Sequence, residues 1–130
     1  MSDCVADTHA LYWYLAAHPT LGENARAVLQ AAEQGQGFVY IPSIVVAELY
    51  YLNVKLGQPL AFNQDYHRLA GAGQFRFVDF KATDVLQFDE LSAIPEMHDR
   101  IVVGVAHTLG LPLLTRDQAI LNSGIVPIIW

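Results

Sequence analysis

The apolar residues of the chain follow two alternating patterns: short runs rich in β-branched and aromatic residues, and longer stretches with helical spacing. The short runs predict strands at residues 2–6, 38–41, 75–80, 111–115 and 125–130. The longer stretches predict helices at residues 10–17, 22–34, 44–56, 61–71, 83–91 and 99–109, with a short helix after Asp117. Strands that alternate with helices predict an α/β fold with a central, mostly parallel, five-stranded sheet between helices.

Polar residues and glycines give the expected ends of these helices. Asp7 can cap the first helix, Ser43 is a good N-cap for the helix at 44–56, and Thr83 stands at the start of the helix at 83–91. Gly110 follows the helix at 99–109, where a left-handed residue commonly ends a helix. These residues set the expected ends of the helices.

Length and composition narrow the class of protein. A chain of 130 residues without repeats or linker-like segments predicts one domain spanning 1–130. Polar residues interrupt every apolar stretch well short of the roughly 20 residues needed to span a bilayer. The first residues lack the basic segment and long apolar core of a secretory signal, and a single cysteine excludes an internal disulfide. We therefore expect a cytoplasmic protein with no membrane partner.

The net charge of −6 argues against a protein that holds nucleic acid on a broad basic surface. Seven basic residues leave room for local phosphate contacts, and a bound cation would cancel part of the negative charge. A catalytic encounter with nucleic acid is therefore compatible with the composition, whereas a scaffold role is disfavoured.

Four isolated acids stand beside the ends of apolar runs, in a chain that is only 15% charged. Asp7 and Asp117 follow expected strands, Glu48 lies in the helix after the second strand, and Asp99 lies in the first turn of its helix. In an open parallel sheet such positions meet at the carboxyl edge. Carboxylates in one cleft repel each other unless a divalent cation neutralises them, and oxygen ligands favour Mg²⁺ or Mn²⁺. The pattern predicts a metal-dependent acidic site.

Each acid also has a simpler explanation. Asp7 and Asp117 can be N-caps or turn residues, Asp99 can complement a helix dipole, and Glu48 can pair with an arginine. The joint occurrence of all four favours the metal site. The aromatic run Tyr12-Trp13-Tyr14 could stack on bases, but packing in the core or at a dimer contact is favoured.

Five blocks, taken together and in this order, resemble the PIN domain, and within it the VapC-type toxins of prokaryotic toxin–antitoxin systems. The resemblance runs from residue 4 to the C-terminus. The blocks are Asp7-Thr8-His9-Ala10-Leu11, Ala47-Glu48-Leu49, His98-Asp99-Arg100-Ile101, Leu114-Thr115-Arg116-Asp117 and Ile128-Ile129-Trp130. The chain departs from many relatives just before the third acid, where it has Glu96 and Met97 in place of an aspartate and a proline.

The resemblance implies a PIN-like, three-layer α/β/α fold and a Mg²⁺- or Mn²⁺-dependent endoribonuclease. It also implies a type II toxin, held inactive by a cognate antitoxin. The candidate catalytic residues are Asp7, Glu48, Asp99, Asp117 and Thr115. All four acids are candidate metal ligands: Asp7 and Asp99 are expected to bind directly, and Glu48 and Asp117 directly, through water or in a second metal site. The Thr115 hydroxyl is expected to orient a carboxylate or a water.

Residues beside these acids are further candidates. Arg116 is the preferred phosphate contact, while Arg100 either binds the phosphate or pairs with a site carboxylate. Glu96 is either an outer acid of the site or a solvated surface residue, and the second interpretation is preferred. His98 is a candidate because it adjoins Asp99.

Two other functions compete with the ribonuclease. Phosphotransfer on an aspartate also uses strand-end acids with Mg²⁺, but it requires a paired acid beside Asp7 and a lysine after a late strand. Here Thr8 and His9 follow Asp7, and the last lysine is Lys81. A non-catalytic PIN-fold binding or regulatory protein remains as the main alternative, although such proteins usually lose one or more acids. The apolar excess, with Tyr50 and Tyr51 on an expected helix, also predicts a homodimer.

Overall fold

The computed structural model describes residues 2–130 and is built on one sheet of five parallel strands. The strand order is β3-β2-β1-β4-β5. Chain order runs outward from β1 in one direction to β3, and then resumes on the other side of β1. The strands are β1 (Cys4–Ala6), β2 (Val39–Pro42), β3 (Phe75–Val78), β4 (Leu113–Leu114) and β5 (Ile128–Ile129). The predicted five-stranded α/β architecture is confirmed, and the sheet is wholly parallel.

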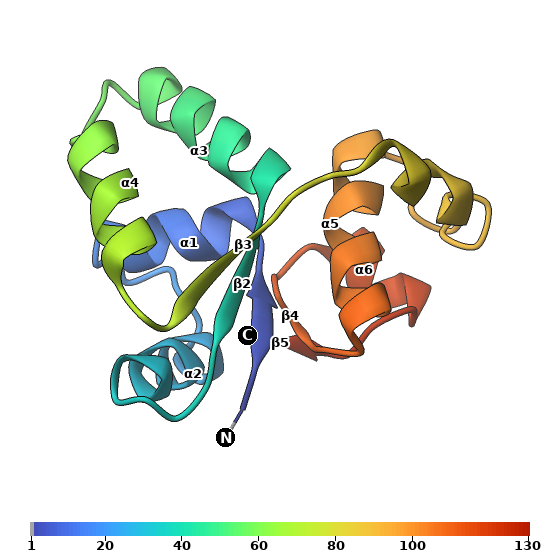
Figure 1. Cartoon of the computed structure of the whole chain (residues 1–130), viewed down its shortest axis with the longest axis horizontal. Helices are drawn as coiled ribbons and strands as arrows, with labels where there is room; N and C mark the ends of the chain where they lie inside the picture. The colour runs from blue at the N-terminus through green and yellow to red at the C-terminus, as the bar shows by residue number, and fades with distance from the viewer. Residues whose placement is uncertain (1) are drawn as a thin grey trace.

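Helices cover both faces of this sheet (Figure 1). Helices α1 to α4 lie on one side, and α5, α6 and the 3₁₀ segment η1 lie on the other. These elements are α1 (Thr8–Leu15), α2 (Glu23–Glu33), α3 (Ser43–Lys55), α4 (Phe62–Gly71), η1 (Ala82–Gln87), α5 (Met97–Leu109) and α6 (Gln118–Ser123). Among residues 2–130, no helix has the length and apolar character needed to cross a membrane.

The core is centred on β1 and β4, which lie next to each other in the sheet. Every residue of both strands is fully buried. Strands covered on both faces need side chains that are apolar on both faces, which explains why these runs are continuously apolar and do not alternate. The central strands thereby fix the position of whatever follows them at the carboxyl edge.

Three local predictions were wrong. Ser43 does not cap α3, because it is the first helical residue, and its Oγ accepts the backbone N–H of Phe80 at 3.1 Å. The predicted helix at 83–91 is a 3₁₀ segment that begins at Ala82, followed by turns. Thr83 lies inside this segment and does not cap it; the Asp84 carboxylate instead accepts the backbone N–H of Lys81 at 2.8 Å.

Other boundaries differ by a few residues. Helix α1 begins at Thr8, two residues before the predicted start, because Asp7 caps it directly. Helix α5 begins at Met97 with Glu96 as its N-cap, so Asp99 lies in the first turn as predicted. Gly110 ends α5 in the left-handed region with φ 67°, a conformation that suits glycine.

Candidate functional site

A cleft of about 850 Å³ opens at the carboxyl edge of the sheet, beside β1, where the strand order reverses. All four predicted acids line it. Asp7 follows β1 and Asp117 follows β4, whereas Glu48 comes from α3 and Asp99 from α5. Segments far apart in sequence therefore bring their carboxylates to one place. Their roles as ligands or catalytic groups stay predictions.

The two strand-end acids are held by the helices they begin. Asp7 Oδ1 accepts the backbone N–H of Ala10 at 2.8 Å, and Asp117 Oδ1 accepts that of Ile120 at 3.1 Å. Each acid is thus an N-cap, as the simpler explanation proposed, and each also faces the cleft. Capping and a site role are compatible here, because the cap fixes the carboxylate at the cleft wall.

Thr115 connects these two acids. Its side chain is fully buried, its Oγ1 accepts the backbone N–H of Asp117 at 3.1 Å, and it hydrogen-bonds the carboxylate of Asp7. Burial raises the pKa of Asp7, and the bonds from Thr115 and from the Ala10 backbone oppose that rise. The hydroxyl is therefore in a position to orient a carboxylate, one of the two tasks predicted for it.

Glu48 is bound by a residue that the sequence analysis passed over. Thr8 Oγ1 donates to Glu48 Oε1 at 2.8 Å. Within residues 2–130 the ion pairs join Arg68 to Asp65 and His98 to Glu96, so the proposed arginine partner of Glu48 is not present. The signal that could have identified Thr8 is its place directly after Asp7, at the same end of β1.

Asp99 experiences the whole acidic cluster. Its pKa is raised to about 6, first by partial burial and then by the negative charges of Asp117, Glu96, Glu48 and Asp7. Its backbone N–H donates to Glu96 Oε2 at 2.8 Å, while no donor among the described residues bonds its carboxylate. Within residues 2–130, Asp99 is therefore the one of the four acids whose carboxylate accepts no hydrogen bond.

The residues around Asp99 divide between the cleft and the solvent. His98 lines the cleft, and its Nδ1 lies 2.7 Å from Glu96 Oε1. Glu96 is exposed and does not line the cleft, so it acts on Asp99 through its charge and its helix cap. This agrees with the preferred interpretation of Glu96 as a solvated residue.

The two candidate phosphate contacts lie in different surroundings. Arg100 is outside the cleft lining, its Nε donates to the carbonyl of Ile94, and it forms no ion pair with any residue in 2–130. Its predicted pairing with a site carboxylate is therefore absent. Arg116 is exposed, lines the cleft, and places its guanidinium carbon 4.6 Å from the centre of the Trp13 ring. Of the two arginines, Arg116 alone is positioned for the predicted contact.

The chemistry of the site fits a hard divalent cation. The cleft offers four carboxylates, and no arginine or lysine is paired with them in residues 2–130. Burial raises the pKa of Asp99, and the charges of the other three acids raise it further. Yet across the described residues no three His, Cys, Asp or Glu side chains are arranged to hold an ion as they stand. Binding would therefore require the carboxylates to turn toward a common point.

The single cysteine lies outside this chemistry. Cys4 is fully buried in β1, and burial, followed by the charge of Asp3, raises the pKa of its thiol to about 12. A thiol that stays protonated is a poor nucleophile. The predicted inert role of Cys4 agrees with this environment.

Comparisons with known proteins agree with the geometry. The family described as PIN domain matches residues 4–123. No curated protein matches the sequence.

Several solved structures share the fold. One is VapBC2 from Rickettsia felis, bound to a DNA fragment from the VapBC2 promoter. It has 18% identity and a TM-score of 0.68, and the alignment covers 97% of this chain and 96% of that one. Another is FitAcB from Neisseria gonorrhoeae, with 20% identity, a TM-score of 0.64, and coverage of 96% and 95%. PAE2754 from Pyrobaculum aerophilum has 15% identity, a TM-score of 0.61, and coverage of 98% and 89%.

Proposed function

The chain belongs to the PIN domain family, and we propose that it is a metal-dependent endoribonuclease and the toxin of a type II toxin–antitoxin system. The observation that carries the proposal is the convergence of Asp7, Glu48, Asp99 and Asp117 on one cleft, where no lysine or arginine of residues 2–130 forms an ion pair with them. A structural role for four such acids would have favoured neutralising ion pairs, because half-buried carboxylates in one cleft repel each other.

Asp7 and Asp99 would hold Mg²⁺ or Mn²⁺ directly, with Glu48 and Asp117 as direct or water-mediated ligands. Such an ion, when bound, acidifies a coordinated water and draws off charge from the phosphate. Thr115 and Thr8 fix the carboxylates of Asp7 and Glu48 by hydrogen bonds.

The remaining residues of the cleft would position RNA. Arg116 is the only arginine or lysine among the described residues that line the cleft, so it is the natural contact for a phosphate approaching the acids. An RNA strand reaching an acidic site needs such a local cation because the chain has no net positive charge.

A protein partner is the second part of the proposal. The similar structures include FitAB bound to an IR36 DNA fragment and VapBC2 bound to promoter DNA, which supports a cognate antitoxin for this chain. Exposed apolar side chains on α3, among them Tyr51 at 71% and Val54 at 43%, offer surface for a partner or a homodimer. Light scattering of the purified chain at micromolar concentration should give a dimer mass, and a monomer mass would contradict the homodimer.

The test is cleavage of a mixed RNA pool by folded, antitoxin-free protein in Mg²⁺, in Mn²⁺ and in EDTA. Wild type should give discrete products with metal only, and Asp7→Asn should give none. Asp89→Asn is the matched control, because Asp89 is exposed and lies outside the cleft. Absence of cleavage by wild type under every condition, with folding shown by circular dichroism, would favour the non-catalytic PIN-fold binding protein.

A further inference from the structure

The guanidinium of Arg116 lies over an aromatic ring at the edge of the cleft. Its guanidinium carbon lies 4.6 Å from the centre of the Trp13 ring, and both residues line the cleft with the four acids. Arg116 is exposed, whereas Trp13 is half-buried against the core. The guanidinium is therefore supported from one side by an indole and open to solvent on the other.

Trp13 is in turn fixed by other aromatic rings. The ring of Trp130 meets it edge-on at 5.8 Å, and His18 stacks at 6.1 Å with an interplanar angle of 29°. Trp130 can approach because residue 22 is glycine; a Cβ there would lie 2.5 Å from the Trp130 carbonyl carbon. The orientation of Trp13, and with it that of Arg116, is thus set by packing between α1, the start of α2 and the C-terminal segment.

This arrangement suits a nucleobase more than a bare phosphate. A guanidinium is planar, stacks on aromatic faces, and can carry a second π-system on its free face. Bases of single-stranded RNA stack on aromatic side chains and on arginine planes, whatever their sequence. A point contact with phosphate would not require the guanidinium to lie over an indole. The exposed His9 ring, 5.2 Å from Trp13, extends the same surface along α1.

We propose that Arg116, held over the Trp13 ring, is a stacking platform for a nucleobase of single-stranded RNA, next to the phosphate that is cut. The proposal rests on the ribonuclease function for its substrate class, and it goes beyond the phosphate contact by giving the side chain a base-dependent role. Trp13 is a positioning residue, since it acts through Arg116.

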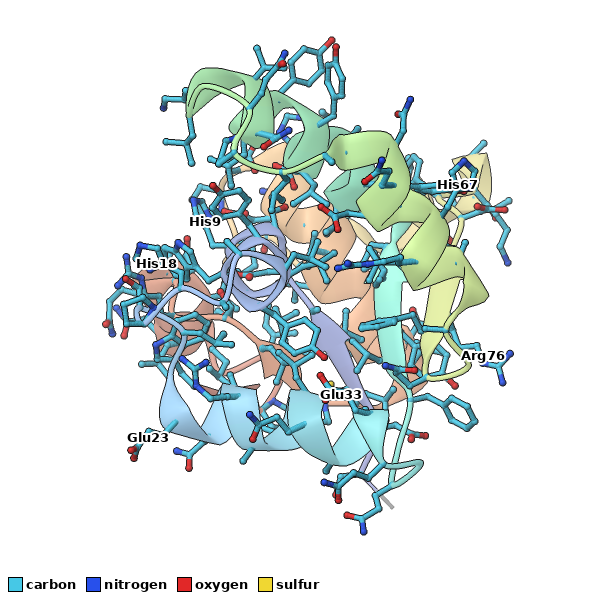
Figure 2. All side chains as sticks on the ribbon, turned by 90° about the vertical axis from the view of Figure 1, so that its left-hand side faces the viewer. His9, His18, Glu23, Glu33, His67 and Arg76 are labelled. Atoms are coloured by element: carbon cyan, nitrogen blue, oxygen red, sulfur yellow. The ribbon has the colours of Figure 1, made fainter. Side chains whose placement is uncertain are left out.

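The chain supplies a matched control. Arg76, on β3, is also exposed and also lies with its guanidinium carbon 4.6 Å from an aromatic ring centre, that of Phe38. It does not line the cleft. Figure 2 shows Arg76 on the opposite edge of the molecule from His9 and His18, the two histidines whose rings neighbour Trp13. Both arginines therefore carry the same charge over an aromatic ring, but only Arg116 lies at the cleft.

The experiment measures binding of a short fluorescein-labelled RNA of mixed sequence by fluorescence anisotropy. A second probe of equal length and charge carries abasic spacers in place of the bases. All proteins carry Asp99→Asn, so that no probe is cut. Arg116→Lys keeps the charge and loses the plane, and it should weaken binding of the intact RNA roughly tenfold, the scale of one lost stacking contact. Arg76→Lys should change it less than about twofold, as expected for a site remote from the bound strand.

The abasic probe separates the base from the phosphate. Arg116→Lys should bind this probe as well as its parent does, because no base remains to be stacked. Trp13→Phe, which keeps an aromatic support, should fall between the parent and Arg116→Lys on intact RNA. Equal affinity of Arg116→Lys and its parent for intact RNA would overturn the platform. Equal losses for Arg116→Lys and Arg76→Lys, a loss that persists on the abasic probe, or no RNA binding by the parent would do the same.

These outcomes are distinguishable from failure of the ribonuclease function. If wild type cuts RNA while Arg116→Lys binds intact RNA like its parent, only the platform fails. If binding depends on Arg116 and on the bases while wild type cuts nothing with metal, only the nuclease function fails.

Discussion

The two acids at strand ends and the two acids on helices reach the same cleft with very different support. Asp7 and Asp117 each cap a helix. The Thr115 hydroxyl hydrogen-bonds the Asp7 carboxylate and the backbone N–H of Asp117. Glu48 has one hydrogen bond from Thr8, and the carboxylate of Asp99 has none within residues 2–130. The first pair is built into the fold, whereas the second is presented to the cleft from α3 and α5.

This difference separates stability from function. Replacing a strand-end acid removes a helix cap, which costs about 1 kcal/mol of folding free energy in addition to any loss of activity. Replacing Asp99 removes a charge that its neighbours repel. Variants at the two kinds of position should therefore differ in folding stability even where they agree in lost activity.

Asp99→Asn should have the largest effect on cleavage, and it should separate loss of activity from loss of stability most clearly. We expect RNA cleavage to fall at least about 100-fold, the scale for loss of one charge-stabilising group in an active site. Stability at neutral pH should be unchanged or higher, because the amide carries no charge to repel. Single-turnover cleavage and chemical denaturation measure the two effects. A large loss of stability would show that Asp99 is structural.

Thr115→Val should reduce both activity and stability. The hydroxyl bonds to the Asp117 backbone and to the Asp7 carboxylate, and the residue is fully buried. Leaving these groups unpaired should cost about 1–3 kcal/mol of unfolding free energy, measured by urea denaturation. Cleavage should fall roughly tenfold or more, as when positioned partners of a site are removed. Thr115→Ser should retain most of both, and a stable, active Thr115→Val would contradict the connection between the strand-end acids.

The contribution of Asp99 to the pH dependence of stability should be visible when wild type is compared with Asp99→Asn. Its pKa is about 6 in the folded protein against an ordinary value of 3.8. As the pH falls, the folded state therefore binds this proton at a higher pH than the unfolded state does. Without metal, stability from this group should fall as pH rises from about 4 through about 6, and remain low above that. Denaturation of wild type and Asp99→Asn across this range measures the difference. Curves of the same shape for both proteins would refute the raised pKa.

Thr8→Val should have the smallest effect. It removes one hydrogen bond to a half-buried carboxylate, so we expect about 1 kcal/mol of lost stability or less. Cleavage should fall only a few-fold, since Glu48 keeps its place on α3. Thr8→Ser is the control. A loss as large as that of Asp99→Asn would mean that Thr8 itself contacts the substrate.

The fold could be predicted because its signals are local. Alternating apolar runs and helical stretches identify the five strands and their order in the chain. The helix caps were less predictable, because Ser43 bonds to Phe80, a residue far away in sequence. The segment after Lys81 has helical composition, but its carboxylate and turn bonds produce a 3₁₀ segment instead.

The site was predictable to a similar degree. The acids could be found because strand ends of a parallel sheet share one edge. Their partners could not, since the bond from Thr8 to Glu48 and the packing of Trp130 on Trp13 depend on how separate segments pack. The same applies to Arg116, whose charge was visible in the sequence but whose position over the Trp13 ring was not.

The central claim is that the four acids form one cation site, and titration of the metal-free protein with Mn²⁺ by calorimetry tests it most directly. Wild type and the control Asp89→Asn should bind Mn²⁺ with equal affinity, while Asp99→Asn should bind at least about tenfold more weakly, as expected when one oxygen ligand is lost. Equal affinity in all three proteins, or no binding by wild type, would contradict the claim.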